Sequence, residues 1–480
     1  MPLVLPGNVA SAVSGAFEVK NSCRFNDGDS AYLSRTLGTP TDNNVWTFSF
    51  WIKRGLLSSS VQLFDSDTGS GDEGYLMINA SNAMNWYMYQ GSPALDVALY
   101  PSRVFRDPSA WMHVVMIYNS PDGTSGNRMQ IWINGVRETS FSTETQPGSS
   151  AISTINEGKA HRIGAKMDDS RYFDGYLAEV VFIDGSALAP TSFGEYDEDS
   201  PQIWKPIDVS GLTFGDNGFY LDFEDSSALG NDVSGNDNDW TANNLAAVDQ
   251  STDTPTNNFC TMHPLNASPA VTLSEGNNTV FGNTTSSGNV SGTICPDGGK
   301  WYAETKYRTI ISNYPRAGQF QINTVFGRAL NATAGSPGNL AYECQMTAAG
   351  AMTTGASETG GWGSSVSAGG IVQIAIDCDN GATYIGINNT WQNSGDPTSG
   401  ASKTGAATTW TVGTQSQGAT FGDSCYNGSY SDWNFGANGA FAGTAVSSAA
   451  SDANGYGAFE YAPPSGYLAL CTKNLGSDGG

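Results

Sequence analysis

The chain has 480 residues, and its 46 acidic residues outnumber its 21 Lys and Arg residues, which gives a formal net charge of −25. This acidity argues against nucleic acid and anionic membranes as partners, because both attract basic surfaces. Charged residues make up only 14% of the chain, whereas Gly (58) and Pro (20) are abundant. Such a composition disfavours helical bundles and predicts two or three domains built from short strands and turns.

The first residues contain neither a basic region nor a long apolar run, so the sequence predicts no signal peptide. No stretch approaches the roughly 18 apolar residues of a membrane span, which argues against membrane insertion. We interpret residues 1–24 as an N-terminal arm for attachment or assembly. The seven cysteines are odd in number and form no CxxC pair, a pattern that predicts free thiols in a chain folded in a reducing cytoplasm.

Strand patterns fill residues 25–200. Residues 46–53 alternate strictly between the two faces of a strand, whereas residues 111–118 are apolar on both faces. The dipeptide Asn134-Gly135 lies between two apolar runs and predicts a hairpin, because both turn positions need a positive φ. With turn residues every 8–12 positions, this half predicts an antiparallel β-sandwich of the jelly-roll type.

The composition changes after this region. Residues 201–254 are rich in Asn, Gly and Asp and show one short strand pattern, at 219–223, so we interpret them as an acidic connector. Residues 255–480 again contain strand patterns, such as 300–310 and 371–379, joined by long loops rich in Gly, Ser and Thr. Because no helical periodicity is evident, this part predicts a second all-β domain.

Six stretches of the first half form a recognisable series. They are WTFSFWIKR (46–54), LFDS (63–66), WMHVVMIY (111–118), MQIWINGV (129–136), HRIGA (161–165) and FDGYLAEVVFIDGSAL (173–188). With these stretches in this order, the first half resembles the laminin-G-like, concanavalin-A-like jelly roll. The resemblance covers about residues 25–200 and implies a sandwich of antiparallel strands. In that match, Glu179 occupies a position where the fold normally carries an acidic structural residue.

Four stretches of the second half form a second series. They are GGKWYAETKY (298–307), GGIVQIAIDCDNGATYIGINNTW (369–391), NFGANGAF (434–441) and FEYAPPSGYLAL (459–470). With these stretches, the second half resembles a SPRY domain, which is another concanavalin-A-like sandwich. The resemblance implies that residues 369–391 form a central hairpin with its turn at Asn380-Gly381. The insertion at 392–432 departs from the compact family pattern.

The two halves are joined by FYLDFEDSSALGNDVSGNDNDWTANNL (219–245) and TPTNNF (254–259). With these joining segments, the tandem as a whole is similar to structural proteins of tailed phages, marine ones especially. The resemblance implies a protein of the virion surface that folds in the cytoplasm of the bacterial host before assembly. It also implies contacts with other tail or capsid proteins, and symmetric assembly makes a homo-oligomer the expected state. Three functions stay open: a non-enzymatic tail fibre or similar appendage that recognises a host-surface glycan, a capsid decoration or fibre protein with a packing role, and a polysaccharide-degrading tailspike.

Catalytic residues are not predicted. Glycoside hydrolases need two carboxylates that flank the scissile bond. Asp222 and Glu224 are two residues apart on one strand face, but no third carboxylate is in register with them. The three histidines, His113, His161 and His263, are too dispersed to form a ligand cluster. We therefore expect the protein not to be an enzyme and to require no cofactor.

Aromatic residues next to polar loops are the candidates for glycan binding, because a pyranose presents an apolar face and a rim of hydroxyls. The segment 86–89 is aromatic on both faces of an expected strand, and in the second half several tryptophans lie in or beside Gly- and Ser-rich loops. Packing in the core is the alternative for each of them. The candidates are Trp86, Tyr87, Tyr89, Trp362, Trp391, Trp410 and Trp433.

The Gly-rich segment 65–73 is a candidate calcium site, because Ca²⁺ prefers clustered oxygen ligands. The candidate ligands there are Asp65, Asp67, Asp72 and Glu73. The alternative is an ordinary acidic surface loop. A second, weaker candidate for calcium is the pair Asp168-Asp169.

Overall fold

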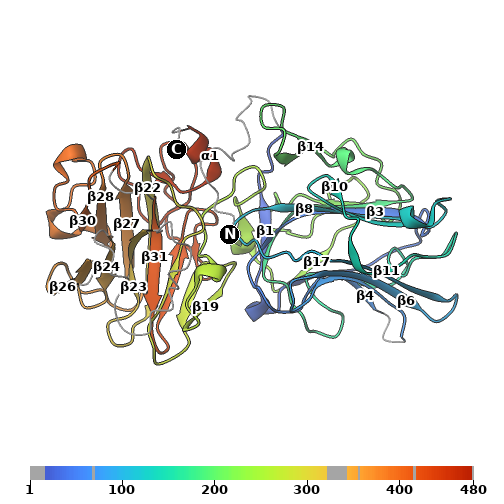
Figure 1. The fold of residues 1–480 in the computed structure, drawn as a ribbon, viewed down its shortest axis with the longest axis horizontal. Coiled ribbons are helices and arrows are strands. Elements are labelled where there is room, and N and C mark those ends of the chain that lie inside the picture. The colour runs from blue at the N-terminus through green and yellow to red at the C-terminus, as the bar shows by residue number, and fades with distance from the viewer. Residues whose placement is uncertain (1–16, 68–70, 322–342, 355–356, 414–417, 478–480) are drawn as a thin grey trace. The chain divides into compact units, whose positions relative to one another are not determined.

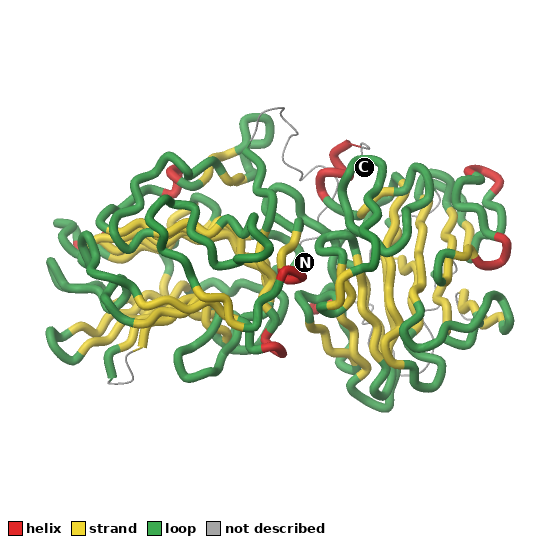
Figure 2. Tube along the Cα trace, turned by 180° about the vertical axis from the view of Figure 1, so that it is seen from behind, coloured by secondary structure: helices red, strands yellow, loops and turns green. Residues whose placement is uncertain are grey.

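The structure of the chain is a computed structural model that describes residues 17–67, 71–321, 343–354, 357–413 and 418–477. The chain divides into two compact units, and the boundary between them falls after Thr256. Each unit is a sandwich of antiparallel sheets, which confirms the predicted all-β class. Figure 2 shows the strands in yellow, with helical segments confined to short red turns.

The first unit contains two large sheets, named here after a central strand of each. The β3 sheet has the order β10-β9-β8-β3-β13-β1-β18, with β16 paired to β13. Its strands are β10 (Val136–Arg137), β9 (Met129–Ile133), β8 (Met112–Asn119), β3 (Val45–Arg54), β13 (Gly175–Asp184), β1 (Ser22–Phe25), β18 (Gln250–Ser251) and β16 (Phe219–Leu221). The predicted hairpin turn is confirmed, because Asn134 and Gly135 have φ values of 48° and 74°.

The β6 sheet faces the β3 sheet across the core and has the order β11-β7-β6-β5-β4-β12-β2-β17. Its strands are β11 (Phe141–Thr145), β7 (Leu95–Pro101), β6 (Met84–Gln90), β5 (Glu73–Ile78), β4 (Val61–Asp67), β12 (Ala160–Ile163), β2 (Tyr32–Thr36) and β17 (Thr241–Asn243). The inward-facing side chains of both sheets form the core, where the ring centroids of Trp46 and Trp86 lie 5.4 Å apart.

The outer side of the β3 sheet carries a second apolar layer. Val115, Val181 and Tyr220 are buried there against Phe193 and Phe214 from the chain that follows β13. The strands β14 (Gly194–Tyr196) and β15 (Trp204–Pro206) form a small two-stranded sheet in this region. In Figure 1, β14 and several loops lie over β3 and β8, whereas β4 and β6 form the lower boundary of the unit.

Residues 201–254 do not form the connector that we expected. They pack into the first unit, where β16, β17 and β18 pair with β13, β2 and β1. Between these strands, side chains take the place of backbone groups as hydrogen-bond partners. The Asp232 carboxylate, for example, accepts the backbone N–H groups of Tyr220 (2.8 Å) and Asn238 (2.8 Å). The Asn- and Asp-rich composition therefore reflects backbone hydrogen bonding rather than a linker.

Two buried ion pairs fasten the end of this segment to the β3 sheet. Lys53 Nζ lies 2.6 Å from Asp253, and Arg24 Nη2 lies 2.8 Å from Asp249. The predicted N-terminal arm at 1–24 is also corrected, because its residues 22–24 belong to β1. Residues 1–16 of that arm lie outside the described residues.

The second unit also contains two large sheets. The β22 sheet consists of β19 (Val271–Ser274), β20 (Thr279–Gly282), β32 (Tyr430–Asn434), β22 (Lys300–Thr309), β27 (Ile371–Asp377), β28 (Ala382–Ile387), β29 (Thr390–Trp391), β30 (Thr408–Thr409) and β35 (Leu468–Ala469). The β31 sheet consists of β21 (Gly288–Ser291), β31 (Ala419–Cys425), β23 (Arg316–Gln321), β24 (Cys344–Thr347), β25 (Met352–Thr354) and β26 (Ser357–Thr359). The expected central hairpin is β27–β28, whose turn contains Gly381 with a φ of 74°.

The C-terminal part of the chain covers the outer side of the β22 sheet. Tyr302 of β22 packs there with Phe459 and Tyr467, next to the short strands β33 (Ala440–Phe441) and β34 (Thr444–Ala445) and the helix α1 (Thr472–Ser477). The buried Glu304 carboxylate fixes this layer, since it accepts the backbone N–H groups of residues 460 and 461 at 2.8 Å each. Burial raises the pKa of Glu304 to about 7.

Short 3₁₀ turns connect several of these strands. They are η1 (Asp27–Asp29), η2 (Ser125–Asn127), η3 (Pro190–Ser192), η4 (Ala247–Asp249), η5 (Pro264–Asn266), η6 (Gln392–Ser394) and η7 (Gly400–Ser402). Among the described residues, no helix is long and apolar enough to cross a membrane.

Candidate functional site

Strand β6 separates the aromatic candidates of the first unit into two groups. Trp86 and Met88 point into the core and are fully buried. Tyr87 and Tyr89 point to the outer side of the sheet, where Tyr87 is half-buried and Tyr89 is 39% exposed. Trp86 therefore does not belong to a surface site, because its ring packs between the two sheets.

Tyrosines on the neighbouring strands extend this outer surface. Tyr75 of β5 is paired with Tyr87 of β6, and their ring centroids lie 5.5 Å apart at an interplanar angle of 44°. Tyr100 of β7 is half-buried on the same side and lies close enough to raise the pKa of Tyr75. We call Tyr75, Tyr87, Tyr89 and Tyr100 the tyrosine face.

Acidic side chains flank the tyrosine face. Glu73 precedes Tyr75 by two positions on β5, and the exposed Asp96 lies on β7 opposite Tyr89. Burial, followed by the charge of the nearby Asp96, raises the pKa of Tyr87 to about 12. Burial and the proximity of Tyr100 likewise hold the pKa of Tyr75 above its usual range. Both phenols are neutral at physiological pH, as the ordinary tyrosine pKa of about 10 already requires.

A loop between β12 and β13, residues 164–173, is fastened to the outer side of β4 next to this face. The Asp65 carboxylate accepts the backbone N–H of Met167 (2.7 Å) and the side-chain amide of Gln62 (2.7 Å). The carbonyl oxygen of Arg171 accepts the backbone N–H of Gln62 (2.8 Å). Hydrogen bonds at residues 167 and 171 therefore hold the loop against β4.

The predicted calcium ligands have separate roles in the structure. Asp65 is buried and engaged by the loop, and Asp72 accepts the backbone N–H of Gly91 at 2.9 Å. Glu73 flanks the tyrosine face, and the side chain of Asp67 lies outside the described part of the chain. No three His, Cys, Asp or Glu side chains among the described residues gather as a metal ion would require. Calcium binding stays a prediction.

The second calcium candidate is occupied by ion pairs. Asp168 lies 2.6 Å from Lys166 Nζ and also accepts the hydroxyl of Ser170. Asp169 lies 2.8 Å from Arg162 Nη1. Both carboxylates are therefore compensated by cations of the same region.

The tryptophan candidates of the second unit are not brought together into one surface. Trp433 is buried and donates its indole N–H to Asp423 at 2.6 Å. Trp362 and Trp391 are partly buried and pack against two different apolar clusters. Core packing accounts for these three rings.

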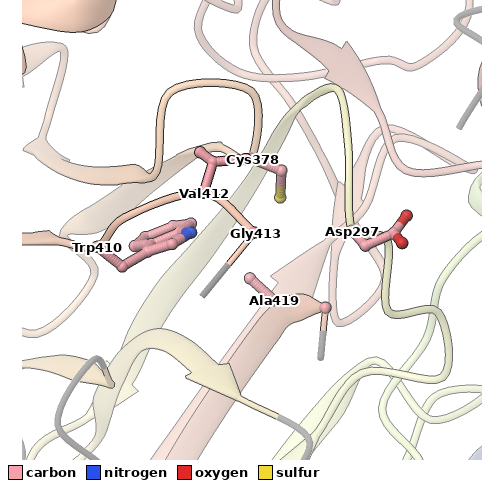
Figure 3. A pocket seen from close by; sticks show the side chains of 7 residues that line it. Asp297, Cys378, Trp410, Val412, Gly413 and Ala419 are labelled. Carbon is pink, nitrogen blue, oxygen red and sulfur yellow. The ribbon is translucent and has the colours of Figure 1, made fainter. Parts of the chain in front are cut away.

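Trp410 is 6% exposed and lines a shallow hollow in the second unit. Figure 3 shows its ring opposite the Asp297 carboxylate, with the Cys378 sulfur between them. Two residues of the lining, Gly413 and Gly418, flank residues 414–417 in the sequence, which lie outside the described residues. Its lining consists of Asp297, Cys378, Trp410, Val412, Gly413, Gly418 and Ala419.

His113 lies 2.8 Å from a serine hydroxyl, but its hydrogen bonds run in the wrong direction for catalysis. The indole N–H of Trp204 donates to His113 Nδ1 at 2.9 Å, so a neutral ring carries its proton on Nε2. That nitrogen then donates to Ser49 Oγ at 2.8 Å, whereas a general base would accept the hydroxyl proton. Burial lowers the pKa of His113 to about 3.

The acidic structural residue Glu179 and the carboxylates considered for catalysis, Asp222 and Glu224, have separate surroundings in the first unit. Glu179 is buried at a β-bulge with a φ of 48° and accepts the hydroxyl of Tyr220 at 2.6 Å. Burial raises the pKa of Glu179 to about 8. Asp222 is half-buried, and Glu224 forms an exposed ion pair with Lys20. That the protein is not an enzyme stays a prediction.

Comparison with known families supports the architecture of the first unit. Residues 26–191 match the family model described as the concanavalin A-like lectin/glucanases superfamily. This match confirms the expected concanavalin-A-like jelly roll for that region. No curated protein matches the chain.

Several solved structures are similar to parts of the chain. A putative carbohydrate binding protein from Bacteroides ovatus ATCC 8483 is 15% identical over 47% of this chain, with a TM-score of 0.34. The alignment covers 59% of that protein. A heptameric SAP-like pentraxin from Limulus polyphemus is 15% identical over 36% of this chain and 80% of its own, with a TM-score of 0.28. The SPRY domain of human HERC1 is 10% identical over 36% of this chain and 96% of its own, with a TM-score of 0.27.

Proposed function

We propose that the protein is a non-enzymatic carbohydrate-binding protein and that the tyrosine face of its first unit contacts the glycan. The observation that carries this proposal is the group of four partly exposed tyrosines on the outer side of a single sheet. Two of their rings are fixed side by side on adjacent strands. The match of residues 26–191 to a superfamily that includes lectins supports the same class of protein.

The chemistry of the face suits a sugar. The apolar face of a pyranose packs on an aromatic ring, and its hydroxyls bond to polar groups at the edge of that ring. Glu73 and Asp96 supply carboxylate oxygens that accept hydrogen bonds from hydroxyls. Because the tyrosines are already held by neighbours, little conformational entropy is lost when a ligand binds.

The proposal includes a location on a virion appendage such as a tail fibre. This part is supported by the similarity of the tandem to structural proteins of tailed phages. It is tested by antibody labelling of particles from the phage that encodes the chain. Labelling of a tail appendage is the expected result, and labelling confined to the capsid surface favours the decoration protein instead.

The glycan proposal is tested by a glycan array probed with the full chain and with the variant Tyr87→Ala/Tyr89→Ala. We expect the wild type to bind and the variant to lose at least tenfold in affinity, since each ring supplies stacking worth about tenfold. Tyr196→Ala is the matched control, because Tyr196 is 43% exposed in the same unit but lies away from the β6 sheet, on β14. Absence of wild-type binding, or equal binding by the double variant, contradicts the proposal.

A further inference from the structure

Arg171 is an exposed cation beside the tyrosine face. It belongs to the loop of residues 164–173, and its Nη1 lies 3.5 Å from the sulfur of Met77. Met77 follows Tyr75 by two positions on β5, so the two side chains share the outer side of the strand about 7 Å apart. A sugar placed on Tyr75 therefore lies within reach of the guanidinium group.

The position of Arg171 is fixed by its backbone. The residue has a φ of 54°, in the left-handed region that only a few non-glycine residues occupy. Its carbonyl oxygen bonds to the Gln62 N–H, and Asp65 holds Met167 in the same loop. The loop is thus organised before any ligand arrives.

Among the residues that the structure describes, no carboxylate lies within ion-pair distance of Arg171, although the charge of Arg171 also acts on the nearby Asp168. The two acidic residues of its own loop are taken, because Asp168 pairs with Lys166 and Asp169 pairs with Arg162. Arg162 also lies 4.3 Å above the ring of Tyr32. Of the cations in this region, Arg171 is therefore the one left to bind an external anion.

We infer that the glycan bound by the tyrosine face is acidic and that Arg171 binds its carboxylate or sulfate group. This inference rests on the proposed function. Arginine suits the role because its planar fork of N–H donors matches a carboxylate or a sulfate ester. The charges along β5 also orient the ligand, because Glu73 lies on one side of Tyr75 and Arg171 on the other. The acidic group therefore points away from Glu73.

The inference is tested with matched pairs of oligosaccharides. Oligogalacturonate is compared with its methyl ester, and a sulfated galactan oligosaccharide with its desulfated form, by calorimetric titration of the full chain. We expect the acidic member of at least one pair to bind about tenfold more tightly, as one charge-assisted contact provides. Which pair shows the preference distinguishes a carboxylate ligand from a sulfate ligand.

Variants of Arg171 test whether this residue causes the preference for the acidic oligosaccharide. Arg171→Gln removes the charge and should abolish the preference for the acidic member, with binding of the neutral member unchanged. Arg171→Lys retains the charge and should keep part of the preference. Arg103→Gln is the control, because it removes an exposed cation of the same unit that pairs with Glu138. Melting temperatures of all variants exclude unfolding as the cause of a loss.

The outcomes separate the two proposals. Equal affinity for both members of each pair, or a preference that survives in Arg171→Gln, overturns the inference about acidic glycans and leaves the tyrosine face as the binding surface. Absence of binding to acidic and neutral oligosaccharides alike overturns the proposed function itself.

Discussion

The two units share a sandwich architecture but use their aromatic side chains differently. In the first unit, the outer side of the β6 sheet presents partly exposed tyrosines. In the second unit, the C-terminal layer covers the outer side of the β22 sheet, and outward-facing residues of the β31 sheet such as Gln345 and Ser424 are buried. An aromatic residue is therefore a candidate for ligand contact only where no further layer covers its sheet.

Trp86 and Tyr87 show this distinction within two consecutive residues. The replacement Trp86→Ala should lower the free energy of unfolding of the first unit by about 3–5 kcal/mol, because it opens a cavity in the core. Tyr89→Ala should change it by less than about 0.5 kcal/mol, as is usual on a surface. Denaturant unfolding monitored by circular dichroism measures both. Similar losses for the two variants would contradict the assignment of their side chains to opposite faces.

The ion pair between Lys53 and Asp253 tests whether residues 201–254 belong to the first unit. Lys53→Met leaves Asp253 buried without its cation and should destabilise the unit by about 3–5 kcal/mol. The matched control is Lys20→Met, which breaks an exposed pair with Glu224 and should cost less than about 1 kcal/mol. Thermal and denaturant unfolding compare the two. Equal stability of both variants would restore the interpretation of this segment as an independent connector.

The buried carboxyl of Asp423 gives the second unit a pH-dependent stability. Burial raises the pKa of Asp423 from 3.8 to about 6, so the folded state favours the protonated form. Protonation of Asp423 therefore stabilises the folded state relative to the unfolded state by about 3 kcal/mol. This stabilisation is fully present below pH 3.8 and is lost as the pH rises through 6. Asp423→Asn should flatten this slope. The free energy of unfolding is measured for both proteins between pH 4 and pH 8. An unchanged dependence on pH in the variant would contradict the assignment of this effect to Asp423.

Local patterns were sufficient to predict much of the fold. The alternation in residues 46–53 predicted β3, and the two predicted hairpin turns, Asn134-Gly135 and Asn380-Gly381, occur between β9 and β10 and between β27 and β28. The incorporation of residues 201–254 could not be predicted in this way. It depends on contacts such as the one between Lys53 and Asp253, which are 200 positions apart in the chain.

The candidate site was only partly predictable for the same reason. Alternation in residues 86–89 identified Tyr87 and Tyr89, but aromatic residues on both faces concealed which face is outside. Tyr75 and Tyr100 come from neighbouring strands, whose register depends on the whole sheet. Arg171 comes from a loop that is placed by hydrogen bonds to β4, and no local pattern of residues indicates such a placement.

The central claim is that the rings of the tyrosine face contact a glycan, and Tyr87 tests it most directly. Tyr87→Phe keeps the ring and removes only the hydroxyl near Asp96, whereas Tyr87→Ala removes the ring. Both are measured by calorimetric titration with the oligosaccharide that the wild type binds best. We predict an affinity within about threefold of wild type for Tyr87→Phe and a loss of about tenfold or more for Tyr87→Ala. Unchanged affinity in a folded Tyr87→Ala variant would contradict the account.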